Sequence, residues 1–181
     1  MQHKKYKPSD IRGEIGIYFT WAINALFPIG RGAKRFLFEN ELVIRKMSQK
    51  LLKDIDFKPG PIYRGIILKD KVTQIKPEKF NYHLSFSTDR SVAENFADIN
   101  GFGSEHEDLK SKLGEYGYLI EYTPQLSEVV FHYSFLSMLP FEEAFNKVIS
   151  DGRGQVEFLK TQKEVTILQP QLPFLNITPL F

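Results

Sequence analysis

The chain contains no cysteine among its 181 residues. This absence excludes disulfide bonds, thiolate nucleophiles, and zinc or iron–sulfur sites that use cysteine ligands. Histidine is also scarce: the chain has only His3, His83, His106 and His132, which lack the paired spacing of a histidine-ligated metal. We therefore expect no metal site.

Excess charge of one sign and long apolar runs are missing as well. The net charge is +2, although residues 1–60 carry 12 Lys/Arg against 6 Asp/Glu. The uncharged stretch 15–30 includes Thr20 and Asn24, so it falls short of the ~20 apolar residues of a membrane span. Asp10 and Glu14 before it do not suit a signal peptide. We expect a cytoplasmic protein without a membrane partner, or one delivered into another cell.

The residues that are present describe a globular chain. Hydrophobic residues make up 42% and aromatic residues 14%, with 16 phenylalanines. A chain of this length forms one compact domain with a substantial core. We therefore interpret residues 1–181 as a single domain, in which a helical N-terminal part (1–57) precedes a β-rich part (58–181).

Hydrophobic periodicity predicts the order of the elements. Apolar residues at helical spacing predict a helix from Ile15 that ends near Pro28 and Gly30, and a second helix over residues 33–55. After the stop at residues 58–61, β-rich runs predict strands at 62–68, 82–87, 118–122, 129–132, 165–168 and 174–177, with short helices at 91–97 and 141–149. We interpret 98–116 as a long polar connection and 151–154 as a flexible joint. The fold class is α+β.

Three local motifs carry possible chemistry. The first is Tyr63-Arg64-Gly65, which opens the first strand after the helices. The forked guanidinium of arginine suits phosphate, and glycine permits close approach of a ligand to the main chain. Without further context, an ordinary arginine at a strand edge is the more common explanation.

The second motif is Ser85-Phe86-Ser87 with the helix that follows it. Strand alternation sends Ser85 and Ser87 to one face and Leu84 and Phe86 to the other. Hydroxyl groups on a sheet can hold a carboxylate in one rotamer. A half-buried strand before a helix capped by Thr88 or Asp89 accounts for the same residues.

The third motif is Gln162-Lys163-Glu164, directly before an apolar strand that ends at a proline. If this segment is extended, Gln162 and Glu164 point the same way and place an amide and a carboxylate in one cleft. Gln155-Val156-Glu157 has the same pattern, but it leads into another polar stretch. We prefer Glu164 over Glu157.

Taken in order, the three motifs resemble the arginine-serine-glutamate class of mono-ADP-ribosyltransferases. That class includes the clostridial Rho-modifying exoenzymes, the binary actin toxins and several phage enzymes. The chain contains a counterpart of each motif of that class. These are the aromatic-Arg-Gly, the Ser-x-Ser followed by an Ala-x-x-Phe-Ala helix (residues 93–97), and the Q-x-E. The likeness covers about residues 15–180, and it implies a two-sheet mixed β core behind the N-terminal helices.

The resemblance implies a site for NAD as substrate. Glu164, Gln162 and Ser85 would be the catalytic residues: Glu164 stabilises the sugar cation, Ser85 orients Glu164, and Gln162 faces the acceptor. The implied NAD-binding residues are Arg64, Gly65, Tyr63, Ser87 and Phe96. The aromatic residue that the class often has three positions before the glutamine is replaced here by Leu159, with Phe158 beside it.

The resemblance leaves the acceptor and the biological setting open. A Q-x-E motif accompanies acceptors other than arginine, so a protein side chain and an RNA or DNA base both stay open. The same residues would serve an NAD glycohydrolase, and an inactive NAD-binding module is a third alternative. An intracellular toxin with an antitoxin or immunity protein, an antiviral defence factor and a phage modifying enzyme all fit the sequence.

Overall fold

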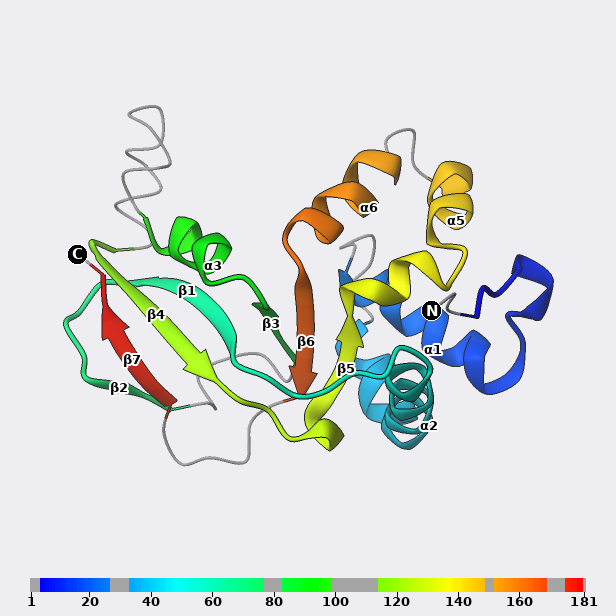
Figure 1. Cartoon of the computed structure of the whole chain (residues 1–181), viewed down its shortest axis with the longest axis horizontal. Helices are drawn as coiled ribbons and strands as arrows, with labels where there is room; N and C mark the ends of the chain where they lie inside the picture. Colours follow the sequence, from blue (N-terminus) through cyan, green and yellow to red (C-terminus); the bar gives the residue numbers. More distant parts are fainter. Residues whose placement is uncertain are drawn as a thin grey trace. The chain divides into compact units, whose positions relative to one another are not determined.

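The structure is a computed structural model that describes residues 4–26, 33–76, 83–98, 114–148, 152–168 and 175–180. Figure 1 shows its elements. In chain order they are η1 (Pro8–Asp10), α1 (Gly13–Leu26), α2 (Ala33–Asp54), β1 (Ile62–Leu68), β2 (Gln74–Ile75), β3 (His83–Ser87), α3 (Arg90–Ala97), β4 (Tyr116–Tyr122), η5 (Leu126–Glu128), β5 (Val129–His132), η6 (Tyr133–Ser137), α5 (Phe141–Val148), α6 (Gly152–Thr161), β6 (Glu164–Leu168) and β7 (Leu175–Pro179). Helices come first and antiparallel strands follow, which confirms the α+β class.

Most predicted elements occur close to their expected bounds. β1 and β5 match the predicted ranges, and the other strands differ by one or two residues at the ends that the structure describes. The predicted helix end near Pro28 and Gly30, most of the polar connection (99–113) and the end of the helix at Ile149 lie outside the described residues.

One expectation about local structure is wrong, and one short strand was not predicted. Residues 152–154 are not a flexible joint, because α6 begins at Gly152. Burial explains the helix: Val156 is fully buried and Leu159 is 6% exposed, so tertiary packing outweighs the poor helix propensity of two glycines. The short strand β2 was not predicted, since two residues are too few to show a pattern.

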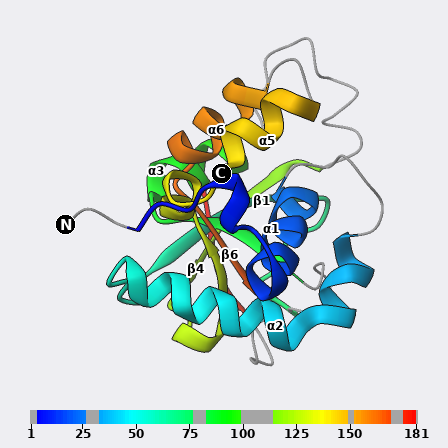
Figure 2. The same cartoon turned by 90° about the vertical axis from the view of Figure 1, so that its right-hand side faces the viewer.

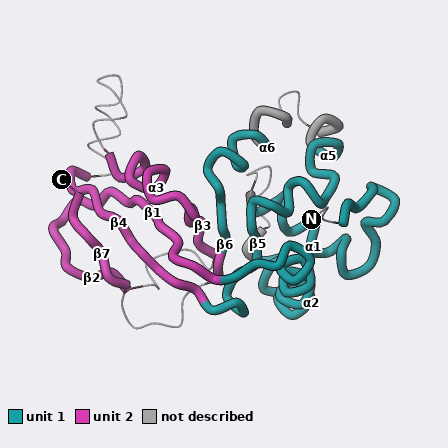
Figure 3. Tube along the Cα trace, in the orientation of Figure 1, with its two compact units in different colours: residues 1–58, 125–166 teal, residues 59–124, 167–181 magenta. Residues whose placement is uncertain are grey.

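The chain divides into two compact units, coloured separately in Figure 3. The first unit, called unit 1, comprises residues 1–58 and 125–166, and unit 2 comprises residues 59–124 and 167–181. The first boundary lies next to the expected change from helical to β-rich sequence. Unit 1, however, also takes in a later segment that contains β5, α5 and α6. The last boundary falls inside β6, after Thr166.

Unit 1 is built around buried aromatic side chains. Tyr18 and Trp21 of α1 are fully buried, as are Phe131, Phe135 and Phe141. The Tyr18 ring lies 5.5 Å from Trp21 and 6.4 Å from Phe135, in tilted and edge-on geometries that aromatic pairs prefer. Figure 2 shows α1 beside α2, and α5 beside α6. The core therefore joins residues more than 100 positions apart in the chain.

Buried hydroxyl groups attach the two N-terminal helices to β5. The Val130 carbonyl accepts a hydrogen bond from the Tyr18 hydroxyl at 2.8 Å. The Ser48 hydroxyl of α2 lies 2.9 Å from the same oxygen and 2.7 Å from the Ile44 carbonyl. Because β5 is an edge strand of the sheet, the Val130 carbonyl needs a hydrogen-bond donor from outside the sheet. The helices supply that partner.

Unit 2 contains β1, β2, β3, β4, β7 and α3. β1 pairs antiparallel with β4 over its whole length, with Arg64 opposite Ile120. β1 also pairs with β3 at Tyr63 and Ser87, and β7 lies between β4 and β2. α3 packs against β1 and β4. This antiparallel arrangement places two of the three motifs on neighbouring strands.

The strands follow the order β2-β7-β4-β1-β3-β6-β5 in one seven-stranded sheet. The finer expectation of a two-sheet core is therefore not confirmed. The sequence patterns mark where the strands other than β2 lie, but they contain no direct information on which strands pair. None of the helices within the described residues combines the length and the apolar composition that a membrane crossing needs.

Candidate functional site

Gly65 lies where α3 packs on β1. A Cβ atom at this position would overlap the Ala93 carbonyl and would lie 2.7 Å from the Ala97 amide nitrogen. Ala93 and Ala97 are themselves buried, and their small side chains let the helix approach the strand. The structure thus gives Gly65 a packing role. The motif alone had indicated only access for a ligand at this glycine.

Arg64 connects the first motif to the second. Its Nη1 donates a hydrogen bond of 2.6 Å to the main-chain carbonyl of Ser85. The two residues are 21 positions apart, and both belong to unit 2. A hydrogen bond from a charged donor is stronger than a neutral one, so this contact fixes the guanidinium against β3.

The side chains of Arg64 and Ser85 point to opposite faces of the sheet. Tyr63 is the cross-strand partner of Ser87, and strand alternation puts Gly65 and Ser85 on the same face as this pair. That face carries α3. Arg64 lies on the other face with Leu84 and Phe86, which are 2% and 4% exposed. The link between the motifs therefore runs through the Ser85 backbone.

Ser87 and Asp89 organise the start of α3. The Ser87 hydroxyl accepts a hydrogen bond of 2.9 Å from the Asp89 amide. The Asp89 carboxylate in turn caps the helix by accepting from the Ser91 amide at 3.0 Å. Of the two caps expected from sequence, Asp89 is the one observed. Ser87 thus contributes to the strand-to-helix turn, and Phe96 on the same helix is 48% exposed.

The third motif begins in a turn, and this corrects the expectation of an extended segment. The Gln162 amide donates to the Phe158 carbonyl at 2.9 Å, and the Lys163 amide donates to the Lys160 carbonyl at 3.1 Å. Lys163 has a φ of 48°, in the left-handed region that helix ends often adopt. Gln162 therefore lies in the turn that follows α6, whereas Glu164 opens β6, so simple alternation does not align them.

The Glu164 carboxylate has a partner on its own strand. The Thr166 hydroxyl lies 3.2 Å from Oε1 of Glu164. Glu164 is half-buried, and Thr166 is 1% exposed. Thr166 was not predicted as a site residue, because threonine is common in strands. Its position two residues after a candidate carboxylate is the only signal that would have pointed to it.

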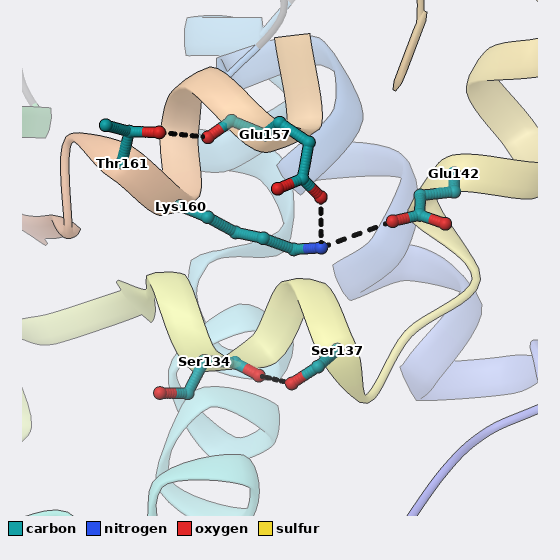
Figure 4. Close-up of polar contacts among 6 residues, drawn as sticks. All are labelled: Ser134, Ser137, Glu142, Glu157, Lys160 and Thr161. Atoms are coloured by element: carbon teal, nitrogen blue, oxygen red, sulfur yellow. Dashed lines mark hydrogen bonds and ion pairs between the residues drawn. The ribbon is translucent and has the colours of Figure 1, made fainter. Parts of the chain in front are cut away.

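The competing Glu157 lies in a different environment. It is in α6, and its side chain is 65% exposed. Figure 4 shows Lys160 between Glu157 and Glu142, with Nζ–Oε1 distances of 2.7 and 3.2 Å. The hydrogen bond to Glu157 contributes most to raising the pKa of Lys160. Glu157 therefore belongs to a surface ion-pair group that connects α5 and α6.

The structure brings the predicted residues together in two sets. Tyr63, Arg64, Gly65, Ser85, Ser87 and Phe96 lie on β1, β3 and α3 of unit 2. Gln162 and Glu164 lie in unit 1, at the junction of α6 and β6. Among the described residues, no group of three or more histidine, aspartate or glutamate side chains is placed to hold a metal ion. No protein-family model matches the chain, and no curated protein or solved structure is significantly similar to it.

Proposed function

We propose that the chain is an NAD-dependent mono-ADP-ribosyltransferase with Glu164 as its catalytic carboxylate. The observation that supports this most directly is the hydrogen bond from Arg64 Nη1 to the Ser85 carbonyl. It joins the first two of the three motifs on neighbouring strands. The third motif adds support, because Glu164 opens a strand directly after a helix end and its carboxylate has a hydroxyl partner.

The proposed reaction breaks the bond between the nicotinamide nitrogen and the ribose C1′. The bonding electrons leave with nicotinamide, and the sugar becomes oxocarbenium-like. A nucleophilic atom of the acceptor then bonds to C1′ and loses its proton. Such a transition state develops positive charge on the sugar, so a preorganised negative charge nearby lowers the barrier.

In this proposal Glu164 supplies the negative charge and binds a ribose hydroxyl. Arg64 binds an NAD phosphate, since a guanidinium presents donors in a rigid fork. The contact with Ser85 fixes the orientation of that fork in advance. Gly65 offers its main chain to the nicotinamide amide, and Gln162 faces the acceptor. Tyr63, Ser85, Ser87 and Phe96 lie on the α3 side of the sheet, opposite Arg64, so this scheme assigns them no contact with the nucleotide that Arg64 binds.

The acceptor is part of the proposal. Gln162 in place of a second glutamate favours an acceptor other than arginine, either a protein side chain or a nucleic-acid base. The basic character of residues 1–60 is compatible with the nucleic acid. We propose action inside a cell as a toxin, a defence factor or a phage modifying enzyme, and an antitoxin or immunity protein as a partner. A two-sheet core of the transferase type belongs to the same proposal.

Replacement of Glu164 tests the assignment. We expect Glu164→Gln to lower NAD turnover about 10²- to 10³-fold, since it removes the charge while keeping the shape. The matched control is Glu157→Gln, which changes the other Q-x-E motif at an exposed helical position. Release of nicotinamide and the thermal midpoint are measured for each variant. A folded Glu164→Gln protein with normal turnover would disprove the assignment.

The fate of the ADP-ribose separates the transferase from a glycohydrolase. We expect labelled NAD incubated with cell lysate to leave label on macromolecules. Protease and nuclease digestion then show whether the label is on protein or on nucleic acid. Free ADP-ribose as the sole product would favour the hydrolase, and NAD binding without turnover would favour an inactive binding module.

A further inference from the structure

The strand β6 contains a hydroxyl group directed at the candidate carboxylate. The Thr166 Oγ1 lies 3.2 Å from Glu164 Oε1, and the two residues are two positions apart on one strand. An ionised carboxylate can only accept, so the threonine hydroxyl is the donor. Both residues belong to unit 1, so the contact is internal to that unit.

We propose that Thr166 is a positioning residue, which holds the Glu164 carboxylate in the rotamer used for the reaction. This inference rests on the proposed function and deepens it. Thr166 does not contact NAD in this scheme. It acts through Glu164 by limiting the side-chain rotations that would otherwise carry the carboxylate away from the sugar.

Thr166 is suited to this role by burial and by side-chain stiffness. It is 1% exposed, so water does not compete for its hydroxyl. A β-branched side chain has a restricted χ1, and neighbours in a packed strand restrict it further. The donor is therefore fixed, whereas the glutamate has three rotatable bonds. One hydrogen bond to a fixed donor removes much of that freedom.

The other side of Glu164 is restrained as well. Lys163 adopts a left-handed conformation with a φ of 48°, directly between the end of α6 and the start of β6. The Lys163 amide is bonded to the Lys160 carbonyl at 3.1 Å, which fixes the turn. The turn sets the direction of the Glu164 backbone and Thr166 sets the direction of its side chain.

A purely structural explanation also fits a buried threonine. Threonine favours strands, and its hydroxyl must find an acceptor when it is buried. That explanation predicts that loss of the hydroxyl changes stability only. The positioning role predicts a change in the rate of the chemical step with little change in folding.

The test uses Thr166→Val, which has the same shape without the donor, and Thr166→Ser, which keeps the donor. At saturating NAD, we expect the valine variant to lose about five- to tenfold in kcat, the range expected for one hydrogen bond. The KM for NAD and the thermal midpoint should stay close to those of the unchanged protein. Thr166→Ser should retain kcat within about twofold.

Two outcomes would overturn the positioning role. One is a Thr166→Val protein with unchanged kcat, and the other is a serine variant as slow as the valine variant. Glu164→Gln, measured in parallel, separates this failure from failure of the proposed function. If Glu164→Gln is inactive and Thr166→Val is normal, only the positioning role fails. If Glu164→Gln is fully active, or the chain does not turn over NAD, the proposed function fails.

Discussion

Gly65 leaves no room for a side chain, because main-chain atoms of α3 lie against it. Its place after Arg64 indicated a backbone open to a ligand, but the structure puts the backbone of α3 against it. A local motif does not reveal which helix will cover which strand. Thr166 was missed for a related reason, because its contact with Glu164 depends on the side-chain geometry of a strand that begins at Glu164.

We predict that Gly65→Ala destabilises the protein by about 3 kcal/mol or more, since the added methyl meets main-chain atoms that cannot move aside. The measurement is the free energy of unfolding by denaturant titration. Gly60→Ala is the matched control: a Cβ there meets nothing within 4 Å. Equal stability of the two variants would mean that α3 does not pack tightly on β1.

At the scale of the elements, periodicity predicted well where one face is buried. α1 and α2 were located from apolar residues at helical spacing, whereas β1 and β5 were located from β-rich runs between turn residues. α6 was missed because Gly152 and Gly154 suggested a joint, whereas burial of Val156 and Leu159 stabilises a helix. The left-handed turn at Lys163 was missed too, because glycine, the usual residue for that conformation, is absent there.

The attachment of α1 to β5 gives a prediction at this scale. Tyr18→Phe removes one of the two hydroxyl groups at the Val130 carbonyl and keeps the ring packing. We expect a loss of about 1 kcal/mol in the free energy of unfolding. Ser48→Ala should cost a similar amount.

The double variant should cost more than the sum of the two single changes. It would leave the Val130 carbonyl without either hydroxyl, and an unsatisfied buried acceptor is expensive. Strict additivity in denaturant titrations would contradict a shared acceptor.

At the scale of the whole molecule, sequence predicted the class but not the composition of the units. The change from helical to β-rich sequence lies next to the boundary at Lys58, yet residues 125–166 return to unit 1. That return depends on the packing of Tyr18 with Phe135 and of Phe19 with Phe141. Contacts across such a separation leave no periodic signal in the sequence.

The free energy of unfolding should depend on pH through His132. Burial lowers the pKa of His132 from 6.5 to about 4. Its Nδ1 accepts from the Ser134 amide at 3.2 Å, which also requires the neutral ring. In the unfolded chain the ring takes up a proton near pH 6.5. Above that pH the ring is neutral in both states, and the protonation of His132 does not lower the stability of the fold. As the pH falls from 6.5 to 4, the free energy of unfolding decreases by about 3 kcal/mol, because only the unfolded chain binds the proton.

We predict that His132→Asn flattens this dependence. Asparagine keeps an acceptor for the Ser134 amide and does not titrate. Thermal midpoints measured from pH 7 to pH 4 should fall less steeply for the variant, although its midpoint at pH 7 should be lower because ring contacts with Phe57 and Tyr133 are lost. Parallel curves for the two proteins would rule out His132 as the titrating group.

The return of residues 125–166 to unit 1 also affects the protein during synthesis on the ribosome. Tyr18 and Trp21 emerge early, but Phe131, Phe135 and Phe141 emerge only after residues 59–124 have been translated. Until then the apolar face of α1 lacks its packing partners. Exposed apolar surface of this kind on a nascent chain is what chaperones bind. Unit 2 is completed later still, because β7 follows the last segment of unit 1 in the chain. Unit 1 can therefore complete its folding only after Thr166 has left the exit tunnel, and unit 2 only after Pro179 has done so.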